Sequence, residues 1–177
     1  MPDDQITPAP TPVPAAQAVT IPADRIHRLR AEQNLPLAIF AGMGAAILGA
    51  AIWAMATVTT GFQIGYMAIA VGFVVGYAVR MGKGVDKIFG IVGGVLALLG
   101  CVLGNVLSVV GFISKEQHIG VIETLSRLDY SKVPEMVTAT FSVMDLVFYG
   151  IAVYEGYRFS FRRVTAQDLG IEPPKPA

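Results

Sequence analysis

Asp145 is an acidic residue inside an apolar stretch of this sequence, and an ionisable side chain in such surroundings can bind a proton or a cation. If the apolar stretch 137–157 is one helix, Asp145 lies nine residues from its start, roughly 12 Å below the nearer membrane surface. A carboxylate at that depth costs on the order of 2.5–3.5 kcal/mol on insertion scales, so it must pair, meet water or bind a proton. Asp145 is therefore the leading candidate for a functional residue.

Four more polar residues are expected near the depth of Asp145. Asn105 lies eight residues before the end of the preceding apolar stretch, which gives a similar depth of roughly 12 Å, and Ser108 lies one turn further out. Ser142 and Tyr149 share the Asp145 face of a continuous helix, at distances of three and four residues. The sequence thus predicts an intramembrane polar cluster of Asp145, Asn105, Ser142, Tyr149 and Ser108.

Two interpretations of Asp145 remain open. It is either a proton- or cation-binding site, or an interhelical hydrogen-bond anchor whose carboxyl is protonated because desolvation raises its pKa. We favour the anchor, because no second intramembrane charge lies near its depth in the sequence.

A second set of charges is expected at the cytoplasmic surface of the membrane. Arg80 ends the second apolar stretch, Lys83 follows in the loop, and Arg158 comes three residues after Glu155. We expect Glu155 to form an interfacial ion pair with Arg80 or Arg158, which is worth little if it is solvated.

The sequence offers no recognisable catalytic, cofactor or metal site. It has no GxSxG, HExxH or P-loop motif, and MGKG at 81–84 lacks the spacing of a Walker motif. The single cysteine, Cys101, excludes a multi-cysteine metal site and is most simply a packing residue. His27 and His118 are expected on opposite sides of the membrane, so they cannot share a metal. We therefore expect neither an enzyme nor a bound cofactor.

Composition and length place these residues in a membrane. Apolar residues make up 54% of the 177 and charged residues 15%, and 13 basic residues balance 13 acidic ones, which argues against nucleic-acid binding. Four apolar stretches, at 37–58, 62–79, 88–113 and 137–157, approach or exceed the roughly 20 residues that cross a bilayer. The predicted fold is all-α, an integral membrane protein with four transmembrane helices.

The basic residues set the expected orientation. Ten of the 13 lie before the first stretch, between the second and third, or after the fourth, and three lie at 115–132. The positive-inside rule then places both termini in the cytoplasm and the bilayer around residues 36–163.

The segments outside the spans have distinct compositions. Residues 1–35 form a Pro/Ala-rich tail with a basic collar, which we interpret as a disordered cytoplasmic tether rather than a PxxP partner motif, and residues 164–177 form a cytoplasmic C-terminal tail. In the extracytoplasmic loop, Ile119, Ile122, Leu125 and Leu128 recur every third residue and predict a short amphipathic helix. It would cap the bundle, lie on lipid, or dock a partner.

Small residues at four-residue spacing predict close helix packing within the spans. Such stripes let helix backbones approach closely in lipid, either within one chain or between copies in a homo-oligomer. The glycines concerned are Gly72, Gly76, Gly90, Gly94, Gly100 and Gly104.

Two stretches carry a family resemblance. VGFVVGYAVRMGKGVDKIFG at 71–90 and MDLVFYGIAVYEGY at 144–157 match the patterns VGxAVR…GKG…FG and MDxxFYGIAxYEGY. Over residues 62–163 the chain resembles a group of uncharacterised small bacterial multi-spanning membrane proteins, and this resemblance implies a bacterial inner-membrane location.

The functional expectation follows from these features together. We expect a non-enzymatic accessory, scaffold or assembly subunit of a membrane complex, whose partners are the lipid bilayer and either a membrane protein or a second copy. The alternative is a small proton- or cation-coupled transporter or channel that uses Asp145.

Overall fold

The computed structural model describes residues 23–62, 65–165 and 168, and helix is the regular structure throughout this part of the chain. The α-helices are α1 (Ala23–Ala31), α2 (Leu35–Thr60), α3 (Tyr66–Val79), α4 (Lys87–Gln117), α5 (Val121–Arg127), α6 (Val133–Thr140) and α7 (Val143–Phe159). Short 3₁₀ helices occupy Arg80–Gly82 and Tyr130–Lys132. The all-α prediction is confirmed for the described residues. The proline-rich segment at 1–22 and most of 164–177 lie outside them.

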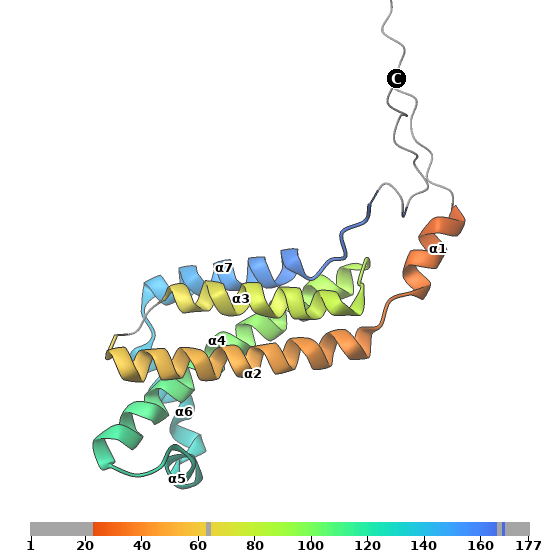
Figure 1. Ribbon diagram of the computed structural model, residues 1–177. Helices are drawn as coiled ribbons and strands as arrows, with labels where there is room; N and C mark the ends of the chain where they lie inside the picture. Colours follow the sequence, from red (N-terminus) through yellow and green to blue (C-terminus); the bar gives the residue numbers. More distant parts are fainter. Residues whose placement is uncertain (1–22, 63–64, 166–167, 169–177) are drawn as a thin grey trace, which may run out of the picture.

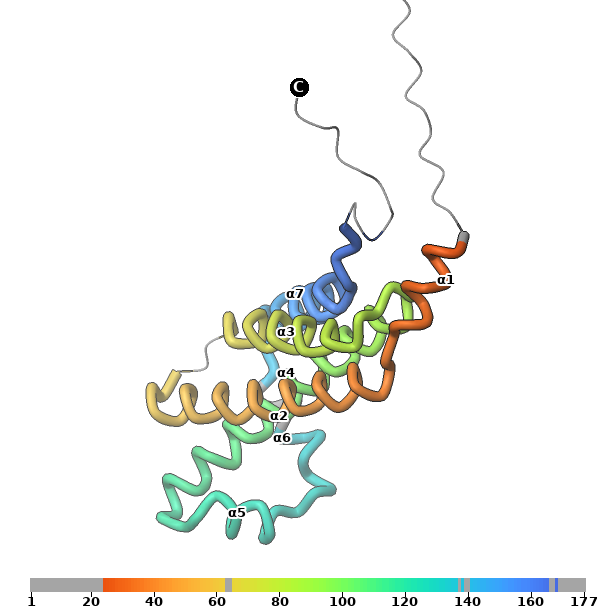
Figure 2. The backbone as a smooth tube through the Cα atoms, turned by 45° about the vertical axis from the view of Figure 1, so that its right-hand side comes forward, coloured from red at the N-terminus to blue at the C-terminus, as the bar shows by residue number. Residues whose placement is uncertain are grey.

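Four helices form a bundle with α3 and α4 at its centre. α2 packs against α3 and α4 on one side, and α7 packs against the same two helices on the other (Figure 1). α1 projects from one end of the bundle, whereas α5 and α6 form a lobe beside the opposite end of α4 (Figure 2). The bundle therefore carries additional helical structure at both ends.

Local sequence signals explain where the first bundle helix begins and ends. The Asn34 side chain accepts a 2.9 Å hydrogen bond from the Leu37 N–H, and Pro36 occupies the first turn, where no backbone donor is required. At the other end Gly61 has φ +73°, and its N–H donates to the Thr57 carbonyl. Glycine adopts this left-handed conformation without the penalty that a Cβ brings.

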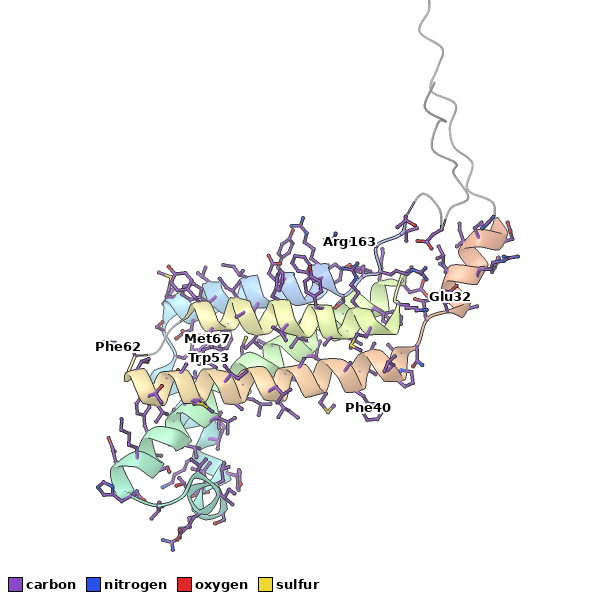
Figure 3. The ribbon with its side chains drawn as sticks, in the orientation of Figure 1. Glu32, Phe40, Trp53, Phe62, Met67 and Arg163 are labelled. Carbon is purple, nitrogen blue, oxygen red and sulfur yellow. The ribbon has the colours of Figure 1, made fainter. Side chains whose placement is uncertain are left out.

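Two of the helices, α2 and α4, are long and apolar enough to cross a membrane. The Tyr66–Gly82 segment is a shorter apolar helix. Only 22% of the most apolar window of α2 is buried, so most of its apolar side chains point away from the bundle. Figure 3 shows this directly, since Phe40 projects outward whereas Trp53 lies between α2 and the helices behind it.

The predicted fourth span, 137–157, is divided between two helices. α6 ends at Thr140, Phe141 and Ser142 are extended, and α7 begins at Val143. The reason is a helix N-cap at Ser142, which the apolar pattern of this stretch does not reveal. Asp145 therefore lies in the first turn of α7 and not nine residues into a helix.

The segment between α4 and α6 also differs from its predicted pattern. α5 covers only Val121–Arg127, so Ile119 precedes this helix and Leu128 follows it. Ile122 is 84% exposed, and the buried residue of α5 is Thr124. The three-residue repeat therefore does not form one apolar stripe along a single helix.

Candidate functional site

Asp145 and Ser142 form a capping box at the start of α7. One Asp145 carboxylate oxygen accepts hydrogen bonds from the Ser142 backbone N–H at 2.8 Å and from the Ser142 hydroxyl at 3.0 Å. In return, the Asp145 N–H donates to the Ser142 hydroxyl at 3.3 Å. Both partners satisfy backbone donors that a helix start otherwise leaves unpaired. Asp145 is only 7% exposed, and its buried carboxylate accepts its hydrogen bonds from Ser142 in the same turn.

Tyr149 connects the first turns of α7 with α4 and α2. Its hydroxyl donates to the Cys101 carbonyl of α4 at 3.2 Å and also interacts with the Asn105 side chain of the same helix. Its ring meets Trp53 of α2 edge to face, with the centroids 6.4 Å apart. Phe141 contacts the same ring from the α6–α7 junction, at 5.5 Å between centroids. Tyr149 thus ties three bundle helices together at one level.

The predicted polar cluster is brought together in part. Asn105 is 2% exposed and meets Tyr149 in the bundle interior, while Ser142 bonds Asp145. Ser108 is also buried, but its hydroxyl donates to the Gly104 carbonyl one turn earlier in its own helix. The Ser108 hydroxyl is therefore satisfied within its own helix.

Two α2 residues in the bundle interior were not predicted. Trp53 and Thr57 are each 1% exposed, and they lie one helical turn apart. Among the described residues, neither the Trp53 Nε1 nor the Thr57 Oγ1 has a hydrogen-bond partner. Their i, i+4 spacing is a signal that could have placed both on one inward face.

Close helix packing accounts for five of the six predicted glycines. A Cβ at Gly72 would strike the backbone of Ala152, and a Cβ at Gly104 would lie 2.8 Å from the Trp53 ring. The remaining clashes would be with Phe159 at Gly76, with Tyr157 and Phe161 at Gly90, and with Val71 at Gly100. Gly94 is the exception, because a Cβ there would make ordinary contacts of 3.4 Å with Val153.

A further close contact between α4 and α7 was not predicted. It joins Gly93 and Gly156, and a Cβ at Gly156 would lie 2.7 Å from the Gly93 carbonyl oxygen. Neither glycine belongs to the four-residue spacings noted in the sequence, so that pattern could not identify the pair.

The predicted charges Arg80, Glu155 and Arg158 make other contacts than the ion pair expected for Glu155. Within the described residues Glu155 forms no ion pair; Arg158 donates to the Tyr154 hydroxyl at 3.3 Å instead. The Arg80 guanidinium lies 5.8 Å from the centre of the Tyr77 ring. Among the described residues the structure does not form the expected Glu155 ion pair, and Arg158 instead extends back toward the aromatic residue one turn earlier.

A charged network at the same end was not predicted. Arg162 forms a 2.7 Å ion pair with Glu32 and a 2.9 Å ion pair with Asp168, and Lys83 lies 3.8 Å from Glu32. The Arg162 hydrogen bond lowers the pKa of Glu32, and the same bond raises the pKa of Arg162. The pKa of Asp168 is lowered chiefly by its hydrogen bond from the Thr165 backbone. These residues join the α1–α2 link to the segment after α7.

A glutamine completes this network from the α1–α2 link. The Gln33 Oε1 accepts hydrogen bonds from the Val85 and Asp86 N–H groups, and its Nε2 donates to the Asp86 carboxylate at 2.7 Å. Arg30 lies 3.3 Å from the same carboxylate. No sequence motif marks these pairings, because their partners are more than 50 residues apart.

The side chains of the described residues do not indicate a metal site, and the comparisons with known proteins do not indicate a family. Among the described residues, no three His, Cys, Asp or Glu side chains gather in a way that could hold a metal ion. Comparisons with protein-family models, with curated proteins and with solved structures found no match to this chain.

Proposed function

We propose that this chain is a four-span membrane protein with both termini in the cytoplasm, and the resemblance over residues 62–163 favours a bacterial inner membrane. The outward-facing apolar surface of α2 supports this proposal. A core helix of a soluble protein is mostly buried, whereas only 22% of the apolar window of α2 is. Soluble monomers rarely expose apolar patches larger than a few hundred Å².

Two of the four bundle helices are long enough to cross a bilayer, and the other two are shorter than its hydrocarbon core. α2 and α4 have 26 and 31 residues, or roughly 39 and 46 Å at 1.5 Å per residue. α3 and α7 have 14 and 17 residues, or roughly 21 and 25 Å, which is shorter than a hydrocarbon core of about 30 Å. Local thinning of the bilayer accommodates short helices at modest cost. In this proposal the lobe of α5 and α6 lies at the extracytoplasmic surface.

Within the membrane we propose a non-enzymatic role as an accessory, scaffold or assembly subunit. The observation that carries this choice is the capping box, because the Asp145 carboxylate takes its hydrogen bonds from Ser142 and supports the start of α7. Close contacts such as those of Gly72 with Ala152 and of Gly93 with Gly156 suit a rigid structural bundle. A subunit of this kind presents its outer surface to partners.

Two measurements test the proposal. Alkaline carbonate should leave the full-length protein in the membrane fraction, and its release would refute the membrane assignment. Purification in a mild detergent should recover a stoichiometric partner or a homo-oligomer. A monodisperse monomer without a partner would contradict the subunit role.

Flux measurements decide between this role and the transporter alternative. Proteoliposomes that contain the wild-type chain and a pH-sensitive dye should show no proton or potassium flux above protein-free vesicles. A flux that Asp145→Asn abolishes, while the variant keeps wild-type unfolding behaviour, would overturn the scaffold proposal in favour of a transporter.

A further inference from the structure

The outer surface of the bundle contains an apolar groove between α2 and the second half of α4. Its volume is about 450 Å³, which is within the usual range for ligand sites. Ala51 and Ala54 of α2 and Gly111 of α4 are among the residues that line it. Small side chains on both helices leave this space open, and a Cβ at Gly111 would press against Val58.

A cation lies at one end of the groove. Among the described residues that line it, Lys115 is the only charged one. Its Nζ donates to the Val58 carbonyl in the last turn of α2 at 3.3 Å, which leaves two of its three donors for another acceptor. The neighbouring hydroxyls are already engaged, since Thr59 donates to Met55 and Ser114 donates to Ile119. Lys115 is thus the group that an anion at this end would meet.

The groove follows the direction of the helices. Leu107, Gly111 and Lys115 are spaced four residues apart on α4, so they cover eight residues or roughly 12 Å of helix. In the proposed topology the Lys115 end faces the extracytoplasmic surface, and the Ala51 end lies deeper in the hydrocarbon. An occupant that suits this shape is long, thin and apolar, with a negative charge at its outer end.

We propose that this groove binds one acyl chain of an anionic phospholipid, whose headgroup phosphate accepts hydrogen bonds from Lys115. A helix from a second protein is about 10–12 Å across with its side chains, so it fits this groove less well than a single acyl chain does. The inference rests on the membrane assignment proposed above, and it adds a lipid-binding site that Lys115 makes selective for negative headgroups.

Native mass spectrometry of the full-length protein in detergent tests this site. The probes are dioleoyl-phosphatidylglycerol and dioleoyl-phosphatidylcholine, titrated separately. A Lys–phosphate attraction of the size found at anionic membrane surfaces corresponds to about five-fold tighter binding of the anionic lipid. We expect this preference in the wild type and in Lys115→Arg, and its loss in Lys115→Gln.

Two further variants separate the groove from nonspecific lipid binding. Ala51→Leu should fill the groove and weaken binding of both lipids, because Ala51 is exposed and the added atoms enter open space. Lys132→Gln removes a charge from the 3₁₀ helix outside the groove and should leave the preference unchanged. If Lys115→Gln keeps the preference, or Ala51→Leu binds both lipids as the wild type does, the site is refuted. Release by alkaline carbonate would instead refute the membrane assignment itself.

Discussion

The Asp145 carboxylate accepts a 2.8 Å hydrogen bond from the backbone N–H of Ser142, three residues earlier in the chain. This bond and its reciprocal partner mark the point where the extended Phe141–Ser142 segment turns into α7. A negative charge in the first turn of a helix is also favoured by the helix dipole. The acid that the sequence placed deep in a continuous span is therefore a residue that starts a helix.

Removal of the cap should destabilise the bundle. Ser142→Ala loses both the hydroxyl acceptor and its bond to Asp145, so we expect the free energy of unfolding to fall by about 0.5–2 kcal/mol. Asp145→Asn should cost less, because its amide oxygen still accepts from the Ser142 N–H. The free energies of unfolding of both variants can be measured by unfolding in sodium dodecyl sulfate. The signal is the fluorescence of Trp53, the only tryptophan. Ser126→Ala on exposed α5 is the control, and a Ser142→Ala variant as stable as this control would contradict the role of the cap.

Two glycines that differ in their surroundings test the helix contacts. Gly72→Ala puts a methyl group against the Ala152 backbone, so we expect a loss of about 1–3 kcal/mol in the same assay. Gly150→Ala on the outer face of α7 meets nothing within 4 Å, so it should be neutral or stabilising. Equal effects of the two substitutions would show that α3 and α7 do not make this contact.

The Glu32–Arg162 ion pair should make the attachment of α1 sensitive to pH. Because the folded pKa of Glu32 is lowered, the stabilisation is complete above the ordinary glutamate pKa of about 4.3 and is lost as the pH falls through the lower folded value. Asp168 also has a lowered pKa, so its own bond to Arg162 should weaken as the pH falls through that lowered value. Hydrogen exchange of α1, corrected for intrinsic rates, should therefore accelerate in acid.

A matched pair of variants separates Glu32 from the other acids. Glu32→Gln should raise the exchange rate of α1 at pH 7, with a small effect because the pair is solvated. Glu123→Gln removes the 2.6 Å ion pair to Arg127 in α5, at the other end of the molecule, and should leave α1 unchanged. If both variants leave α1 exchange at the wild-type rate, the ion pair does not hold this helix.

Cysteine labelling tests the proposed topology. Cys101 is fully buried and should stay unlabelled in the folded protein, so that single cysteines can be added beside it. In intact spheroplasts, an impermeant maleimide should label Ser131→Cys in the lobe, and should label Arg163→Cys only after the membrane is opened. The reverse order would place the termini outside, and equal labelling of both would argue against a sealed four-span arrangement.

Several features were accessible from the sequence because they depend on local patterns. The uncharged stretches at 37–58 and 88–113 predicted the two long helices, and four-residue spacing placed Gly72 and Gly100 at helix contacts. The Glu32–Arg162 pair could not be predicted in this way, because the sequence around either residue does not indicate a partner 130 residues away. The Gly93–Gly156 contact is of the same kind, because it depends on how α4 crosses α7.

The sequence by itself determined that the described part of the chain is helical and that two of its helices are long and apolar enough to cross a membrane. These properties follow from composition and from the lengths of uncharged runs. The tertiary structure alone decided the surroundings of Asp145, because a hydrophobic run does not reveal whether Ser142 continues a helix or caps a new one. It also decided which residues meet in the interior, since Trp53, Asn105 and Tyr149 come from three helices whose crossing no local pattern specifies.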